Sequence, residues 1–274
     1  MYQSFEPIKE LKPYIECYWF WKTESLEHGE DLIFPDAVPE IIIHKGVKPS
    51  IRIGQSPEHI QSTASVIQLV SKCLKLNLLG SLNVIGIRFK PWGLIRFCNH
   101  DIEFFTDQFF TVKNIILPEL HDITTVISNT DSLEDIVNIL NYKFLNVINN
   151  ESSLDRAIIE LNTRVKGRFT CAKDMAAMMN KSSRSFSRLW KNTVRVQIRT
   201  YVRIMRFQEA LSLLRNGQSL SEIPHLIGYS DQAHMNREIK SLCGFTPIQI
   251  RQYLKGETFE QFYYCRPEAP WLFE

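Results

Sequence analysis

The sequence lacks the long apolar runs that hold proteins in membranes. Within its 274 residues, no stretch approaches the roughly 18 uninterrupted apolar residues that a membrane-spanning helix needs. The acidic, aromatic N-terminus also lacks the basic-then-apolar order of a signal peptide. We therefore expect a soluble, cytoplasmic protein that does not bind a membrane.

The sequence also lacks the spacings typical of metal sites and catalytic sites. Its six cysteines include no C-x-x-C pair, so we expect buried free thiols rather than a zinc site or a disulfide framework. There is no glycine-rich phosphate loop and no nucleophile elbow. The polar residues that could serve an enzyme in the first domain fall at no metal-ligand or triad spacing; they are His44, His59, His100, Asp36 and Glu40. We therefore expect no enzyme, no metal and no cofactor.

Charge is divided unevenly along the chain. Residues 166–255 contain 16 Lys and Arg against 5 Asp and Glu, a net charge of +11. Because the whole chain carries +2, the remainder carries −9. This separation is typical of a basic module that binds a polyanion, joined to an acidic module with a different task.

Hydrophobic residues make up 44% of the chain, enough for two domains with cores of their own. The first 130 residues contain short apolar or alternating runs interrupted by Pro, Gly and Asn. Their β-branched and aromatic side chains favour strands, for example at residues 18–21, 40–43 and 84–89. We expect a mainly β domain with a few helices.

The apolar period changes to three and four residues from Ser132 on. This pattern predicts an amphipathic helix over residues 132–148, with Ser132 as its N-cap. A break at residues 149–152 precedes a second helix that starts near Leu154. We place the domain boundary at this break. The apolar stripe of the first helix either fills the core of its own domain or forms a dimer contact.

After Gly167 the helical period persists to about residue 254, and this region contains a diverged internal repeat. Residues 176–196 correspond to residues 224–245 at an offset of 48, which becomes 49 after one inserted residue. Two copies of one supersecondary unit explain this pattern.

Each copy has the order helix, tight turn, helix. The first helices end at Asn180 and Gly228, residue types that readily adopt the left-handed conformation. Ser182 and Ser230 follow, and each is placed to cap a second helix. This is the order of a helix-turn-helix, whose second helix enters the DNA major groove.

A helix of roughly 18 residues is predicted between the two copies, because apolar residues recur from Tyr201 to Leu214. At 1.5 Å per residue it is about 27 Å long. Such a rod can hold two reading helices about one DNA turn apart.

Residues 169–253 resemble the DNA-binding domain of the AraC/XylS family of transcription regulators. The resemblance rests on the run Gly228-Tyr229-Ser230-Asp231-Gln232-Ala233-His234, followed by Arg237 and Gly244-Phe245-Thr246-Pro247. It implies a double helix-turn-helix domain and a variable N-terminal domain for sensing or dimerisation. The first domain, with Phe34-Pro35-Asp36 and Gly86-Ile87-Arg88-Phe89-Lys90-Pro91, is similar to a poorly characterised sensor type attached to such regulators.

Two positions depart from the family pattern. Pro224 stands where the first helix of the second module normally carries Ala, so this helix is expected to be kinked or to start late. Arg195 replaces the Gly that normally ends the first reading helix. Because a left-handed arginine costs about 1 kcal/mol, we expect this helix to run on.

The resemblance also assigns the residues that contact DNA. On the first reading helix they are Ser183, Arg184, Ser185, Ser187 and Arg188, and on the second Gln232, Ala233, His234, Asn236 and Arg237. Arginine can pair with guanine or a phosphate, Gln and Asn with adenine, and Ala with a thymine methyl. His234 contacts a base, the DNA backbone or its own turn. Arg199, Arg203 and Arg206 are expected to be solvated or to face phosphates.

The aromatic content of the first domain suggests a ligand pocket or a packed core. Candidate lining residues are Tyr18, Trp19, Trp21, Phe34, Arg88 and Trp92. The final residues, 256–274, are rich in aromatic and acidic side chains and are expected to dock on a protein surface.

The sequence therefore predicts an α+β protein with three parts. Residues 1–150 form an acidic, mainly β regulatory or dimerisation domain, residues 151–255 form an all-α domain with two helix-turn-helix modules, and 256–274 form a tail. The expected function is sequence-specific regulation of transcription on double-stranded DNA, as a homodimer and with a small-molecule effector. An activator would also contact RNA polymerase. The alternative is a DNA-binding architectural protein whose first domain recruits a partner and senses no ligand.

Overall fold

The computed structural model describes residues 1–24, 30–77, 80–99, 106–150, 152–165 and 171–254. The predicted tail of residues 256–274 and the candidate His100 lie outside these residues. Within the described ranges, no helix is both long enough and apolar enough to cross a membrane.

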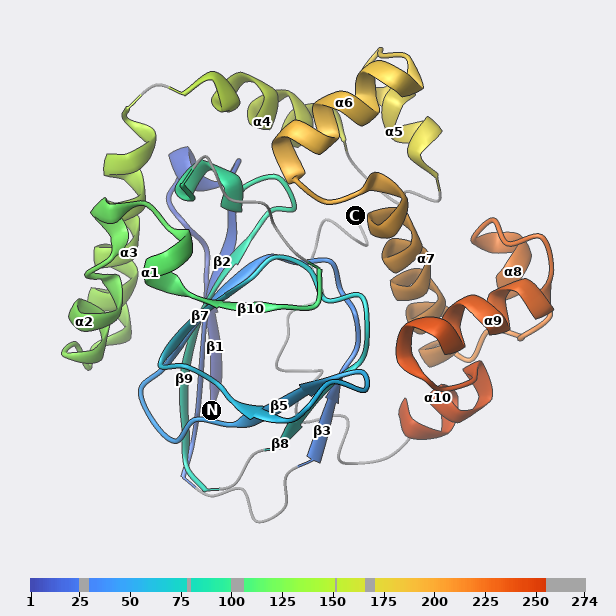
Figure 1. Cartoon of the computed structure of the whole chain (residues 1–274), viewed down its shortest axis with the longest axis horizontal. Helices are drawn as coiled ribbons and strands as arrows, with labels where there is room; N and C mark the ends of the chain where they lie inside the picture. The colour runs from blue at the N-terminus through green and yellow to red at the C-terminus, as the bar shows by residue number, and fades with distance from the viewer. Residues whose placement is uncertain (25–29, 78–79, 100–105, 151, 166–170, 255–274) are drawn as a thin grey trace.

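The N-terminal domain is built from two antiparallel sheets (Figure 1). A six-stranded sheet has the order β1-β2-β9-β4-β7-β10, and a four-stranded sheet has the order β3-β8-β5-β6. The strands are Tyr2–Phe5 (β1), Ile15–Thr23 (β2), Glu30–Ile33 (β3), Glu40–His44 (β4), Ser50–Ile53 (β5), His59–Ile60 (β6), Ala64–Ile67 (β7), Leu74–Asn77 (β8), Leu82–Phe89 (β9) and Phe109–Thr111 (β10). The prediction of a mainly β first domain is confirmed.

The central strands give the larger sheet two apolar faces. On β2, Tyr18 and Phe20 lie in the main core, whereas Trp19 and Trp21 face the four-stranded sheet. This follows from the two-residue period of a strand. On β4, Ile41 and Ile43 likewise belong to the main core. The opposite face packs against the four-stranded sheet, and a second, smaller core lies between the two sheets.

Helices cover the other face of the six-stranded sheet. They are α1 (Val112–Ile115), α2 (Ile123–Ser128) and α3 (Leu133–Ile148), with short 3-10 turns at Lys9–Leu11 (η1), Leu94–Phe97 (η2) and Pro118–Leu120 (η3). The predicted N-cap Ser132 accepts a hydrogen bond from Asp135 N at 3.2 Å. The stripe of α3 is buried in the core of its own domain at Ile136, Leu140 and Phe144. It is therefore not available for a dimer contact.

The described residues of the C-terminal domain form helices joined by turns and form no strand. Its helices are α4 (Ser153–Arg164), α5 (Ala172–Met178), α6 (Ser183–Val194), α7 (Ile198–Arg215), α8 (Ile223–Leu226), α9 (Gln232–Cys243) and α10 (Pro247–Leu254). The predicted connecting helix is α7, with 18 residues and buried side chains from Tyr201 to Leu214. The α+β fold class with two modules joined by a long helix is confirmed.

The turns of the two modules follow the predicted chemistry, with one difference. Asn180 and Gly228 both have positive φ, 51° and 77°, and Ser182 caps α6 by accepting from Ser185 N at 3.2 Å. The prediction that Ser230 caps α9 is wrong, because Asp231 is the cap and accepts from His234 N at 2.7 Å. The residue inserted after the serine moves the capping position by one.

The two departures from the family pattern have different outcomes. Arg195 is left-handed, with φ 61°, and α6 ends at Val194, so the prediction that this helix runs on is wrong. Its neighbours Val194 and Val196 are both buried, which requires the chain to turn between them. Pro224 lies in the first turn of α8, which begins at Ile223, so the predicted late start is confirmed.

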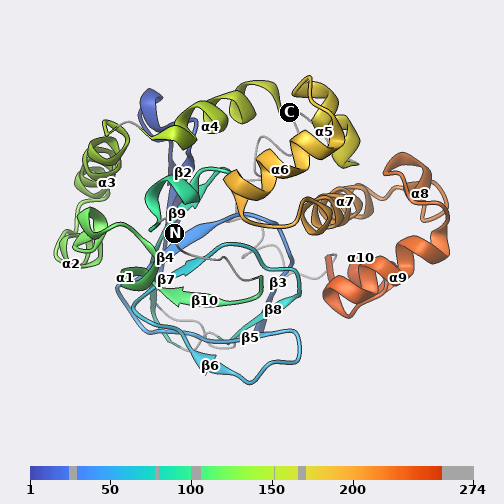
Figure 2. The same ribbon diagram turned by 45° about the horizontal axis from the view of Figure 1, so that its top comes forward.

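Helix α4 connects the helical domain to the N-terminal domain. In Figure 2 it lies between α3 and α6. The carboxylate of Asp155 accepts from Tyr14 Oη at 2.9 Å and from Arg96 Nε at 2.8 Å. Arg96 also donates to Val147 O at 2.9 Å, at the end of α3. The predicted boundary near residue 150 is therefore bridged by buried polar contacts.

The segment after β3 makes a second contact between the domains. The ring of Phe34 lies 5.8 Å from that of Phe207 on α7 and 6.1 Å from that of Tyr253 on α10, centroid to centroid. Gln208 donates a hydrogen bond to Pro35 O. On α9, Leu242 O accepts from Cys73 N at 3.1 Å. Buried apolar side chains consequently form one core that runs through both domains.

Candidate nucleic-acid interface and inter-sheet cavity

Helix α6 presents a polar face to solvent. Phe186 and Trp190 are fully buried against the domain, and the Trp190 ring lies 4.7 Å from that of Tyr201 on α7. The five residues assigned to DNA lie on the opposite side and are all exposed: Ser183, Arg184, Ser185, Ser187 and Arg188. Arg184 and Arg188 are four residues apart, which places them on one face. This face can therefore offer two guanidinium groups to a polyanion.

Helix α9 is arranged in the same way. Met235 and Ile239 are buried, whereas Gln232, Ala233 and Arg237 are exposed. Asn236 is partly buried, and its Oδ1 has no hydrogen-bond partner within the described part of the chain. This oxygen is itself buried, so its missing partner does not show a contact with a bound group.

His234 lies in the first turn of α9 and contacts the turn that precedes the helix. Its Nδ1 lies 3.1 Å from Ser230 Oγ, and its ring meets that of Tyr229 edge-on at 5.2 Å. Of the three contacts considered for His234, the structure shows the one with its own turn. Because Ser230, Tyr229 and His234 hold one another, this histidine helps to fix the start of the reading helix.

Two arginines of α7 have structural partners within the second module. Arg203 donates from Nε to Glu238 Oε1 at 2.9 Å and from a terminal nitrogen to Ser241 Oγ at 3.0 Å. Arg206 lies over the ring of Tyr229, 5.7 Å from its centroid. Arg203 therefore packs against α9 and Arg206 against the turn before it, while 38% of the Arg203 side chain stays exposed, so a phosphate contact of either arginine stays a prediction. Arg199 is exposed, as expected.

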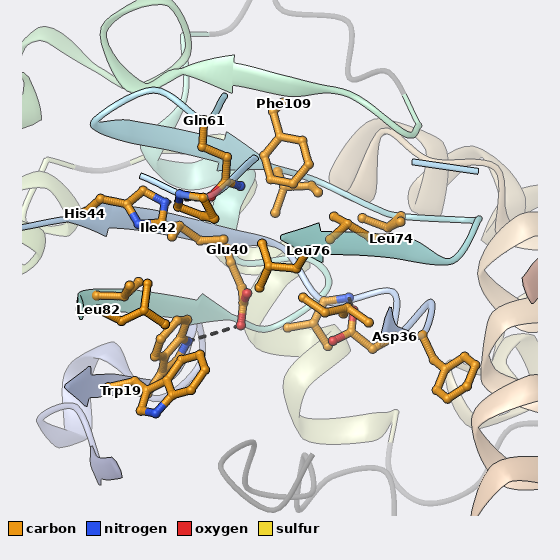
Figure 3. A pocket seen from close by; sticks show the side chains of 18 of the residues that line it. Trp19, Asp36, Glu40, Ile42, His44, Gln61, Leu74, Leu76, Leu82 and Phe109 are labelled. Atoms are coloured by element: carbon orange, nitrogen blue, oxygen red, sulfur yellow. Dashed lines mark hydrogen bonds between the residues drawn. The ribbon is translucent and has the colours of Figure 1, made fainter. Parts of the chain in front are cut away.

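A cavity lies between the two sheets of the N-terminal domain (Figure 3). Its volume is about 80 Å³, and the space between its walls reaches about 850 Å³ when the open mouth is included. Apolar side chains from both sheets form most of its wall, among them Ile42 of β4, Leu76 of β8 and Val84 of β9. It is therefore an apolar hollow of the first domain that opens to solvent between the two sheets.

The sequence-predicted ligand residues divide between this cavity and the main core. Trp19, Trp21 and Phe34 line the cavity, whereas Arg88 is not among its lining residues and donates to Glu40. Trp92 is part of the main core, and its Nε1 donates to Pro13 O at 3.1 Å. Tyr18 is also in that core and donates to Asn141 Oδ1 at 3.1 Å. Trp92 and Tyr18 therefore do not line the cavity.

Trp19 lies directly over strand β9. A methyl group on Gly86 would come within 1.9 Å of its indole ring, so a side chain there would displace the ring. The indole Nε1 donates to Glu40 Oε1 at 3.2 Å, the bond drawn in Figure 3. A glycine in β9 thus allows a tryptophan of β2 to form one wall of the cavity.

Strand β4 supplies the cavity with polar groups that the ligand-site prediction did not include. Glu40, Ile42 and His44 follow one another at a spacing of two and all line the cavity (Figure 3). Asp36 joins them from the segment before the strand. The sequence Glu-Ile-Ile-Ile-His at residues 40–44 could have predicted this placement, because the alternation of a strand puts its first, third and fifth residues on one face.

Two polar groups of the cavity, Glu40 and His44, each have a hydrogen-bond partner inside the domain. Glu40 is buried and accepts from Arg88 Nε at 2.8 Å, which balances its charge. His44 is also buried, and its Nε2 lies 2.6 Å from Gln61 Oε1. Burial lowers the pKa of His44, because the charged form loses its hydration. The imidazole is therefore neutral at pH 7.

The geometry of residues 171–254 defines the class of protein. Two helix-turn-helix modules with exposed, basic reading helices on a common connecting helix form a DNA-binding domain. Residues 175–253 match the family described as "Helix-turn-helix domain". The C-terminal domain is an AraC-type helix-turn-helix domain, which supports a DNA-binding transcription regulator. Residues 3–111 match a domain of unknown function, DUF6597.

Solved structures with a similar arrangement include ToxT from Vibrio cholerae. One ToxT structure is 11% identical, with a TM-score of 0.41, and the match covers 93% of this chain and 99% of that chain. A second, described as bound to an unsaturated fatty acid, is 13% identical, with a TM-score of 0.38, and the match covers 86% of this chain and 94% of that chain. No curated protein sequence matches this chain.

Proposed function

We propose that the protein recognises a specific DNA sequence through α6 and α9 and regulates transcription in response to a small molecule bound between its two sheets. The observation that carries the first part is that each reading helix buries its apolar side and leaves its polar side exposed. The net charge of +11 over residues 166–255 supports binding to a polyanion.

Control by a ligand is supported by the position of Phe34. This residue lines the cavity and also contacts Phe207 and Tyr253 of the helical domain. A molecule that enters the cavity therefore meets a side chain that packs against the DNA-binding domain. Because ligand and DNA would act on one continuous core, binding of one is expected to change the affinity for the other.

The test begins with selection of duplexes from randomised DNA by the full-length protein. The selected duplex is expected to bind roughly 10³-fold more tightly than random duplex, and binding should weaken steeply as salt rises. Equal affinity for selected and random duplex would favour the architectural alternative, in which the protein binds DNA loosely and recruits a partner.

Three single variants then test the assigned contacts. Arg184→Ala and Arg188→Ala are expected to cost roughly 1–3 kcal/mol on the selected duplex and to relax preference at one or two base pairs. Arg199→Ala is the matched control, because Arg199 is exposed on α7 outside both reading helices. If all three variants lose the same amount on specific and random DNA, α6 only positions the protein.

We also propose that the protein acts as a homodimer, as related regulators commonly do. The contact must use a surface other than the stripe of α3, which is covered by its own domain. The exposed face of α3 carries Tyr142, whose side chain is 67% exposed. Sedimentation of the full-length protein at micromolar concentrations tests this, and a monomer throughout would contradict it.

A further inference from the structure

We propose that the cavity between the two sheets binds a hydrophobic organic cation, a small molecule with an aromatic or aliphatic body and a protonated amine or amidine. This inference rests on the proposed control by a ligand and names the chemical class of that ligand. Three independent features of the cavity wall support it: its charge, its hydrogen-bonding groups and its aromatic rings.

The charged residues in the cavity wall are acidic. Asp36 and Glu40 line it, and no Lys or Arg belongs to the lining residues that the structure describes. Arg88 pairs with Glu40, and Lys48 lies outside the lining but near enough to His44 to lower its pKa. Since His44 is neutral, the group formed by Asp36, Glu40 and Arg88 carries a net charge of −1. In an apolar surrounding, such a charge attracts a cation and repels an anion far more strongly than it does in water.

One buried hydrogen-bonding group of the wall, the imidazole of His44, offers an acceptor. His44 donates from Nε2 to the carbonyl oxygen of Gln61, so its Nδ1 carries a lone pair. This Nδ1 is buried and has no hydrogen-bond partner among the described residues. The indole N–H of Trp19 is already used on Glu40. A ligand that brings N–H groups would supply the donor that His44 lacks, whereas a carboxylate would not.

Aromatic rings complete the wall on several sides. Tyr2, Trp19, Trp21, Phe34 and Phe109 all line the cavity. Tyr2 and Trp19 are stacked with their ring centroids 6.4 Å apart. The face of an aromatic ring carries negative charge density, so rings grouped beside a carboxylate are suited to an organic cation.

The experiment uses the full-length protein and three probes of the same size: 4-phenylbutylammonium, 4-phenylbutanol and 4-phenylbutyrate. Their binding at pH 7 is measured by titration calorimetry in the absence of DNA. The ammonium is expected to bind at least tenfold more tightly than the carboxylate and several-fold more tightly than the alcohol. Equal binding of the three, or tighter binding of the carboxylate, would overturn the assignment.

One variant and one control place the cation beside Asp36. Asp36→Asn keeps the oxygen that accepts from Val38 N at 3.2 Å but removes the charge. This variant is expected to weaken binding of the ammonium probe at least fivefold and binding of the alcohol probe less than twofold. Asp122→Asn removes a charge on the exposed surface, where Asp122 pairs with Lys143, and is expected to change neither.

Different results of these binding experiments would contradict the cation assignment and the proposed function. If Asp36→Asn leaves ammonium binding unchanged, the cation assignment fails. If the alcohol or the carboxylate binds best, the cavity remains a ligand site but for another class of molecule. If no probe binds, both the cation and the proposed ligand control lose their support, whereas sequence-specific DNA binding is judged separately from the selection experiment.

Discussion

Arg195 adopts an unfavourable backbone conformation at the end of the first reading helix. It ends α6 with φ 61°, in the left-handed region, which costs a residue other than glycine about 1 kcal/mol. The carbonyl of the preceding Val194 accepts a hydrogen bond from Gln68 of the N-terminal domain at 2.9 Å. The conformation at the end of the first reading helix is therefore fixed by tertiary contacts and not by the residue itself.

The variant Arg195→Gly is expected to stabilise the protein by about 1 kcal/mol, because glycine adopts this conformation without strain. For a chain of this length the midpoint of thermal unfolding should rise by about 2 °C. Arg199→Gly provides the matched control: it removes the same charge within the first turn of α7 and should lower the midpoint. A fall in both variants would show that the loss of arginine, not backbone strain, decides the outcome.

At the same scale, the sequence predicted which residues of the reading helices are exposed but not which arginines of α7 are free. Exposure follows from helical periodicity, which is local. The pairing of Arg203 with Glu238 depends on how α7 and α9 pack, across 35 positions in the chain. The polar lining residues Asp36, Glu40 and His44 were considered for catalysis and found without a motif spacing. Their common face becomes visible only when β4 is known to lie between two cores.

At the scale of elements, α8 is the shortest helix of the second module, with four residues from Ile223 to Leu226. Pro224 is in its first turn, where a missing N–H is tolerated and the fixed φ is favourable. We therefore expect Pro224→Ala to leave the midpoint of thermal unfolding unchanged or slightly lower. Circular dichroism during heating measures this. A rise of several degrees would show that the proline shortens a helix that would otherwise begin earlier.

The helical elements were easier to predict than the arrangement of the strands. Long apolar periods and capping residues fixed α3, α6, α7 and α9 to within a few residues. The strands were recognised by composition, but their division into two sheets was not predicted, because each pairing joins distant segments. Leu82–Phe89, for example, pairs with both Ile15–Thr23 and Glu40–His44. Such non-local pairing leaves little trace in any short window of sequence.

At the scale of the whole molecule, the two domains share a core around Phe34. We expect Phe34→Ala to lower the free energy of unfolding by about 3–5 kcal/mol, since a fully buried ring is lost. We also expect it to split a single calorimetric unfolding transition into two, because it removes the contacts with Phe207 and Tyr253.

Phe144→Ala is the control for that variant. Phe144 is equally buried but packs against Phe89 and Phe97 within the N-terminal domain. It should lower the stability by a similar amount and keep one transition. Two transitions in the unaltered protein would show that the domains unfold independently and that Phe34 does not couple them.

The pair formed by Glu40 and Arg88 also bears on how the sheet assembles. The two residues stand directly opposite each other where β4 meets β9. If β4 slipped by one position, Glu40 would turn toward the aliphatic side of the sheet, and Arg88 would keep a buried charge without its carboxylate. Separating such a pair costs about 3–5 kcal/mol. The ion pair beside the cavity therefore also favours the correct alignment of β4 with β9 and destabilises misaligned sheets during folding.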